Sequence, residues 1–128
     1  MFALDQLWVE KSKRRLLRDA VRANEQRDYA FRSMILSIPA GKVSTYGDVA
    51  AAAGYPLYHR AVARLLRTDP VDQLPWHRVV GAGGEIKLPG DAAYEQWLRL
   101  RSEGVQFKGK RVDMDRFAHP LKPWEVYE

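Results

Sequence analysis

Two short helical patterns separated by a glycine and proline turn occupy the middle of this 128-residue chain. Thr45, followed three residues later by Asp48, forms a pair of the kind that caps a helix N-terminus. Gly54 is expected to end that first helix, and Pro56 is expected at the first turn of the second, which spans residues 57–67. The pattern of the second helix predicts that its buried face consists of Leu57, Ala61, Val62, Leu65 and Leu66. Paired helices are common, so the helix-turn-helix signal is weak by itself, and the basic outer face of the second helix strengthens it.

The chain begins with a strongly basic helical pattern over residues 4–29. Between positions 11 and 22, six cations face a single acid, Asp19; they are Lys11, Lys13, Arg14, Arg15, Arg18 and Arg22. Two interpretations remain open: a solvated amphipathic helix laid on the main domain, or a basic arm that contacts phosphates or a partner protein. A further helix is expected over residues 29–37. We therefore predict a basic helical extension, residues 1–28, and one main domain, residues 29–128.

The segment after the helix-turn-helix predicts a small β-hairpin. Val79–Val80, a glycine-rich turn at residues 81–84 and residues 85–88 have the pattern of two short strands, which would form a wing beside the helix pair. A helix is expected from Ala92 to Glu103, ended by Gly104, and a second small hairpin near residues 108–110. The predicted fold is mainly α with a small β-hairpin wing: a winged helix-turn-helix DNA-binding domain.

Composition excludes several classes of site. The chain has no cysteine, which rules out disulfides, thiolate metal sites and a cysteine nucleophile, and its three histidines are scattered, so we expect no metal and no cofactor. Twenty-one Lys and Arg against sixteen Asp and Glu give a net charge of +5, which suits a polyanionic partner. No apolar run approaches the ~20 residues that span a bilayer, and the N-terminus lacks an apolar signal region, so we expect a cytoplasmic protein without membrane contact.

Four ordered motifs carry a resemblance to a known family. The segments IPAGKVSTYGDVA, AGYPLYHRAVARLLRTDP, LPWHRVVGAGGEI and LRSEGV resemble the DNA-binding domain of O6-alkylguanine-DNA alkyltransferases, over roughly residues 29–124. In those repair proteins the third motif reads PCHRV, and its cysteine accepts the alkyl group. Trp76 stands at that position here, as in the alkyltransferase-like proteins, which keep the binding apparatus without the acceptor.

The resemblance implies roles for individual residues. Arg60 would insert into duplex DNA from the minor groove, and Tyr46 would crowd the phosphate beside the lesion while the nucleotide rotates out. The implied DNA-binding residues are Ser44, Thr45, Tyr46, Arg60, Ala61, Arg64 and Arg67. The implied lesion pocket consists of Tyr46, Trp76, Val79, Pro89 and Gly90, with the carbonyls of Trp76 and Val79 as acceptors. His77, Arg78 and Glu103 are expected as structural polar partners, and Arg78 is expected to pair with Asp69.

Some positions depart from the family pattern. Ala63 adds a methyl group where the family usually has glycine, and Asp69 replaces an asparagine. Pro89 aligns with an arginine of some alkyltransferase-like proteins, and Lys87 lies nearby.

The resemblance implies a monomeric, non-enzymatic sensor that binds O6-alkylguanine in duplex DNA, flips it into a pocket and marks it for nucleotide excision repair. An alternative is a winged-helix transcription regulator that reads undamaged DNA through the major groove. An active alkyltransferase is excluded by the missing thiol.

Overall fold

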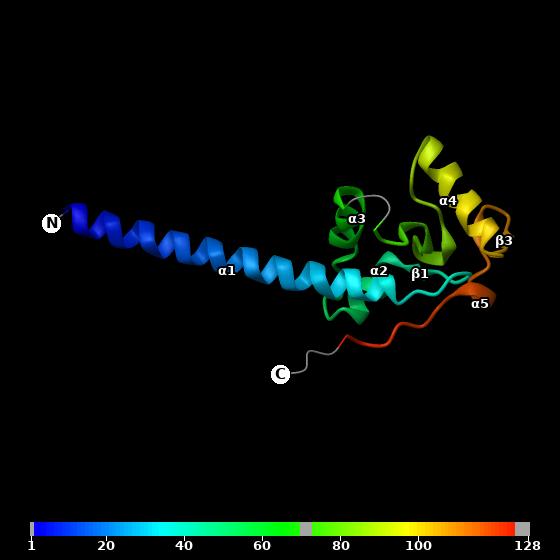
Figure 1. The fold of residues 1–128 in the computed structure, drawn as a ribbon, viewed down its shortest axis with the longest axis horizontal. Helices are drawn as coiled ribbons and strands as arrows, with labels where there is room; N and C mark the ends of the chain where they lie inside the picture. The colour runs from blue at the N-terminus through cyan, green and yellow to red at the C-terminus, as the bar shows by residue number, and fades with distance from the viewer. Residues whose placement is uncertain (1, 70–72, 125–128) are drawn as a thin grey trace.

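The computed structural model describes residues 2–69 and 73–124 (Figure 1). Its helices are α1 (Phe2–Leu36), α2 (Tyr46–Ala52), α3 (His59–Thr68), α4 (Gly90–Ser102) and α5 (Met114–Phe117), with 3-10 turns η1 (Trp76–Arg78) and η2 (Ala82–Gly84). Its strands are β1 (Ser44–Thr45), β2 (Val79–Val80), β3 (Phe107–Lys108) and β4 (Arg111–Val112). The described chain is thus mainly helical with small sheets. None of the helices in the described ranges combines the length and the apolar character that a membrane crossing requires.

The N-terminal helix α1 runs without interruption through position 29, where the sequence pattern predicted a boundary between two helices. Its C-terminal part is buried through Ala30, Phe31, Met34 and Ile35. Residues 6–26 are exposed, apart from a half-buried Ser12, and project beyond the rest of the chain (Figure 1). The interpretation of this segment as a helix laid on the main domain is therefore wrong.

The predicted helix-turn-helix is formed by α2 and α3. Oγ1 of Thr45 accepts a hydrogen bond from the backbone N–H of Asp48 at 3.0 Å, which caps α2 as expected. Gly54 follows the helix in the left-handed conformation, with φ of +96°. α3 starts at His59, two residues later than predicted, because Leu57 adopts φ of +75° and is 89% exposed. The prediction that Leu57 is buried is therefore wrong.

The strand pairing differs from the predicted wing. β2 pairs in parallel with β1, in the register Ser44–Val79 and Thr45–Val80, and forms no ladder with residues 85–88. After β2 the chain turns through η2, closed by a hydrogen bond from the N–H of Gly81 to the carbonyl of Glu85 at 2.7 Å. Pairing β2 to β1 joins the start of α2 to η1, which positions both for the site below. The second predicted hairpin is present as the antiparallel pair β3 and β4.

Two apolar clusters hold the fold together. The larger lies between α1, α2 and α3 and includes Phe31, Ile35, Val49 and Val62, all of them fully buried. The smaller joins β2, α4 and β4 through buried side chains such as Leu100. Together they fix the helix-turn-helix on one side of the β1–β2 pair and α4 on the other (Figure 1).

Candidate nucleic-acid interface

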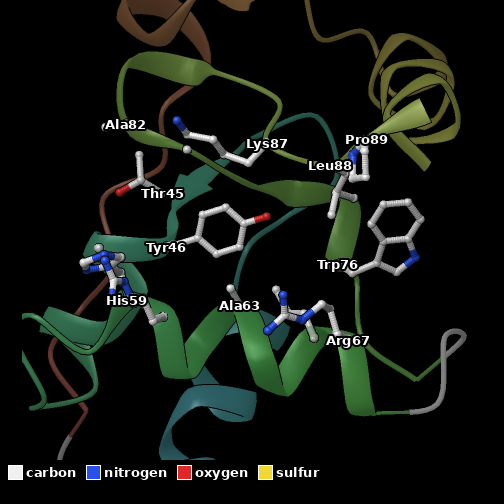
Figure 2. A pocket seen from close by; sticks show the side chains of 14 residues that line it. Thr45, Tyr46, His59, Ala63, Arg67, Trp76, Ala82, Lys87, Leu88 and Pro89 are labelled. Atoms are coloured by element: carbon white, nitrogen blue, oxygen red, sulfur yellow. The ribbon is translucent and has the colours of Figure 1, made fainter. Parts of the chain in front are cut away.

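A pocket of about 770 Å³ opens between α3, the start of α2, η1 and the loop at residues 81–89 (Figure 2). Its wall contains six of the predicted site residues: Thr45, Tyr46, Arg60, Arg67, Trp76 at η1, and Pro89. The wall also contains residues that were not among the predicted site: Gly47, His59, Ala63, Leu66, Gly81, Ala82, Lys87 and Leu88. Much of this set is apolar, and its charged members are cationic. The pocket therefore fits an apolar or aromatic group attached to an anion.

Tyr46 lies in the middle of the pocket with its hydroxyl directed inward (Figure 2). Its position is fixed by the helix cap, because it directly follows the capping residue Thr45 and begins α2. Burial raises the pKa of the Tyr46 phenol, and the positive charge of Arg67 partly offsets that rise. The phenol is therefore protonated at neutral pH and can donate one hydrogen bond to a group in the pocket.

Helix α3 supplies one wall through residues spaced three or four apart. His59 and Arg60 stand one turn before Ala63, and Arg67 one turn after it, so all four share a face. This spacing was the sequence signal for the additional wall residues on α3. Arg64 is exposed but outside the wall, and Ala61 packs against the apolar cluster between α1 and α3. The structure thus places Arg60 and Arg67 together and separates Arg64 and Ala61 from them.

Trp76 is half-buried at the opposite wall, beside Leu88 and Pro89 (Figure 2). The guanidinium carbon of Arg99 lies 5.2 Å from the centre of its ring, within the range of a cation–π contact. Glu95 holds that guanidinium by a hydrogen bond of 2.8 Å. Arg99 and Glu95 on α4 were not predicted, and only the fold brings them to the indole. The indole Nε1 is inaccessible and has no hydrogen-bond partner among the described residues.

Glu103 organises the segment that carries Trp76. Its carboxylate lies 2.7 Å from Nε2 of His77, accepts hydrogen bonds from Arg78 at 2.8 to 3.2 Å, and accepts one from the N–H of Gly41 at 3.0 Å. Arg78 also donates to the carbonyl of Ile38 at 3.0 Å. Burial alone would raise the pKa of Glu103, but the bonds from Arg78, Gly41 and His77 outweigh it and lower the pKa to about 2. The carboxylate is ionised at neutral pH and anchors η1 to α4.

The expected pair of Arg78 with Asp69 does not form. Asp69 instead accepts two hydrogen bonds from Arg32, at 2.7 and 3.0 Å, and the Arg32 bond lowers the pKa of that carboxyl group. This bidentate pair fastens the C-terminal end of α3 to α1. Arg78 bonds to Glu103 instead, and Asp69 pairs with Arg32 of α1.

Three further predicted residues lie outside the pocket wall. Ser44 is 1% exposed and donates to the carbonyl of His119 at 2.9 Å, so its hydroxyl is not available to a phosphate. Val79 is fully buried outside the pocket wall, and its carbonyl accepts a hydrogen bond from Nε2 of Gln96 at 2.9 Å. Gly90 begins α4 and is not part of the wall. The buried Gln96 was missed because a lone glutamine in a helix gives no signal of the carbonyls that it reaches.

No group of three potential metal ligands occurs within the described ranges. The side chains of the pocket wall offer one phenol donor, several cations and an indole face.

One family model and several known proteins are similar to this chain. A family model described as the DNA-binding domain of 6-O-methylguanine DNA methyltransferase matches residues 28–105. A DNA base-flipping protein of Vibrio parahaemolyticus is 44% identical over 75 residues, which cover 58% of this chain and 75% of that protein. Alkyltransferase-like protein 1 of Schizosaccharomyces pombe is 41% identical over 94 residues, covering 71% of this chain and 87% of that protein.

Among solved structures, the crystal structure of S. pombe Atl1 in complex with damaged DNA containing O6-carboxymethylguanine is similar, with a TM-score of 0.64 and 28% sequence identity. The match covers 80% of this chain and 97% of that one. This similarity and the family match confirm the predicted fold class. The proposed division of the chain at residue 28 stays a prediction.

Proposed function

The chain belongs to the family of the 6-O-methylguanine DNA methyltransferase DNA-binding domain, and on this premise we propose that it is a non-enzymatic sensor of O6-alkylguanine in duplex DNA. The observation that carries the proposal is the pocket itself: its wall includes Trp76, at the motif position where alkyltransferases have their acceptor cysteine. Relatives named for base flipping and a structural neighbour bound to damaged DNA support the same conclusion.

The pocket has the size for a flipped nucleotide. Its volume of about 770 Å³ falls within the ~300–1,000 Å³ typical of sites for small molecules, so a purine with an alkyl group fits inside. The base would stack on the Trp76 ring, a contact worth ~1–3 kcal/mol. The phenolic O–H of Tyr46 would donate a hydrogen bond to the base edge, because burial raises the pKa of the phenol and keeps it protonated.

Two cations of α3 would serve different steps. Arg60 would enter the duplex from the minor groove and fill the gap left by the flipped base, since a planar guanidinium can stack and hydrogen-bond there. Arg67 would contact a phosphate and raise affinity for any duplex. Flipping costs a few kcal/mol, and less for a lesion that pairs poorly, which would produce the preference for damage.

The bound lesion would remain unchanged. Alkyl transfer needs a thiolate at the motif position, and this chain has no cysteine. His77 and Glu103, which would serve such a thiolate, instead fix η1 in place. The sensor would then act as a monomer that holds the lesion until nucleotide excision repair proteins take it over.

The test compares two duplexes that differ only in guanine or O6-methylguanine at one position. Fluorescence anisotropy is expected to show at least ten-fold tighter binding to the lesion duplex. A 2-aminopurine beside the lesion is expected to brighten on binding, because flipping unstacks its neighbour. Equal affinity for both duplexes would overturn the sensor and favour the transcription regulator. If labelled methyl moved from the DNA to the protein, the proposal that the protein is non-enzymatic would be overturned.

Two variants locate the site. Arg60→Ala is expected to reduce lesion binding at least ten-fold and to abolish the 2-aminopurine signal. Arg101→Ala is the matched control, because Arg101 is an exposed arginine that stacks on Trp97 of α4, outside the pocket wall. Equal behaviour of the two variants would show that the insertion role of Arg60 is wrong.

A further inference from the structure

The free part of α1 is a helix that packs against no other described element. Residues 6–26 are exposed, apart from the half-buried Ser12, and extend roughly 30 Å along the axis at ~1.5 Å per residue. A helix without tertiary contacts gains no stability from burial. The exposed side chains of this segment therefore indicate which kind of partner it binds.

One side of this free segment carries a stripe of cations, which we call the α1 basic stripe: Lys11, Arg14, Arg15, Arg18 and Arg22. The spacing of three and four residues places all five within about 100° of one another around the helix. All five side chains are exposed, and none forms an ion pair with another described residue. The remaining cation of this stretch, Lys13, lies off the stripe and is 3.9 Å from Glu10.

The stripe is unfavourable for the free helix. Like charges three or four residues apart destabilise a helix, and the stripe contains such pairs at each turn, for example Lys11 with Arg15 and Arg18 with Arg22. An anionic partner that neutralises the stripe would remove this repulsion. The charge pattern therefore favours a polyanion as the partner of the stripe, while Leu16, Leu17 and Val21 are exposed on other sides of the segment.

The stripe also faces away from α2 and α3, the helices that contribute to the pocket. At about 100° per residue, its centre lies opposite the face of α1 that buries Phe31 and Met34 against α2 and α3. A duplex held at the pocket beside α3 is therefore on the other side of α1. A ligand on the stripe must be a separate stretch of nucleic acid.

We propose that the α1 basic stripe is a second, sequence-independent binding surface for duplex DNA, which holds a stretch of duplex other than the one at the pocket. The stripe is about 16 Å long, and an α-helix of ordinary diameter enters the ~12 Å major groove, where phosphates line both edges. This surface goes beyond the proposed lesion pocket and rests on it only in taking DNA as the polyanion. The pocket selects the lesion, and the stripe adds affinity for any duplex.

The test measures binding of an undamaged duplex as a function of salt. The variant Arg14→Gln, Arg15→Gln, Arg18→Gln, Arg22→Gln is expected to lower the slope of log K against log salt by about 3 to 4, since each phosphate contact contributes about 0.9. Affinity at low salt is expected to fall at least ten-fold. Replacement of the same four arginines by lysine is expected to retain most of the slope. Circular dichroism of each variant reports whether α1 stays helical.

A matched control removes the same charge elsewhere. The exposed lysines Lys13, Lys108, Lys110 and Lys122 lie off the stripe, and their replacement by glutamine gives an equal change in net charge. This control is expected to keep the wild-type slope. An equal decrease of the salt slope in both variants would indicate an effect of net charge and would overturn the stripe as a binding surface. An unchanged slope in the variant with four Arg→Gln substitutions would overturn it as well.

Two further arms identify the ligand. A donor-labelled lesion duplex and an acceptor-labelled undamaged duplex are expected to show energy transfer with wild-type protein and none with the glutamine variant. If the salt slope depends on the stripe but no energy transfer is seen, the stripe contacts the same duplex as the pocket. That result would overturn the proposal that the stripe holds a separate stretch of duplex. Stripe-dependent binding to phosphatidylserine vesicles with an unchanged DNA slope would make the partner a membrane. The ratio of lesion to undamaged affinity is expected to be equal in all stripe variants, so failure of the pocket proposal would be seen separately.

Discussion

Nε2 of His77 lies 2.7 Å from Oε1 of Glu103, and this contact joins the segment that carries Trp76 to the C-terminal end of α4. An ionised carboxylate can only accept, so Nε2 of His77 carries the proton in this pair. Arg78 and the N–H of Gly41 bond to the same carboxylate. One acidic side chain thus gathers three segments that are distant in the sequence and fixes one wall of the pocket.

Replacing Glu103 is expected to destabilise the protein and change its response to acid. Glu103→Gln would leave the half-buried Arg78 guanidinium without its anion, at a cost of about 3 kcal/mol in the free energy of unfolding. Because the folded-state pKa is about 2 and the ordinary value is 4.5, the wild-type contribution is complete above pH 4.5 and is lost as pH falls toward 2. Urea unfolding between pH 7 and 2 checks this. The variant is expected to lose less stability over that range, and an equally steep loss would contradict the anchoring role.

Trp76 is expected to determine lesion preference through its aromatic face. Trp76→Ala would remove the stacking surface and lower the affinity for an O6-methylguanine duplex about ten-fold or more, at ~1–3 kcal/mol per stacked base, with little change for undamaged duplex. Trp76→Phe keeps a ring and is expected to retain part of the preference. Anisotropy on the matched duplexes measures both. If the alanine variant kept the wild-type preference, the indole would be merely a packing residue.

Arg99 is expected to position the Trp76 indole. Arg99→Gln removes the cation that lies 5.2 Å from the ring centre and is expected to reduce lesion preference by a factor of about 2 to 5, for a contact of ~0.5–1 kcal/mol. Arg101 offers a matched control, because its guanidinium lies 5.5 Å from the ring of Trp97 on the same helix. Arg101→Gln is expected to bind both duplexes as wild type does. Identical losses in the two variants would point to net charge and not to the Trp76 contact.

Gly84 is expected to tolerate no side chain. Its φ is +89°, and a Cβ there would lie 2.6 Å from the carbonyl oxygen of Val112 and 3.0 Å from its nitrogen, both backbone atoms that cannot move aside cheaply. Gly84→Ala is expected to lower the free energy of unfolding by about 3 kcal/mol or more. Gly54 has a similar φ of +96° with open space around it, so Gly54→Ala is expected to cost only about 1 kcal/mol. Equal costs measured by thermal unfolding would mean that conformation alone, without the clash, sets the penalty at Gly84.

Local patterns predicted the helix-turn-helix well. The Thr45 cap, Gly54 and the apolar positions Val62 and Leu65 each depend on contacts within a few residues, which the sequence encodes directly. The start of α3 was misplaced because Leu57 takes a left-handed conformation that its residue type does not favour. A break in α1 was expected near Tyr29 because the sequence changes there from mostly charged to mostly apolar side chains. The backbone hydrogen bonds of a helix do not depend on that change, so α1 continues to Leu36.

The amino-acid sequence by itself determined the family motifs, the absence of a thiol at position 76 and the helical periodicity of the basic residues. The tertiary structure decided which partners meet: Arg78 with Glu103 instead of Asp69, β2 with β1 instead of a hairpin, and Arg99 with Trp76. It also decided that residues 6–26 stand clear of the domain. The physical reason is that local spacing fixes which side of an element a residue occupies, whereas its partner across the fold depends on how all the elements pack at once.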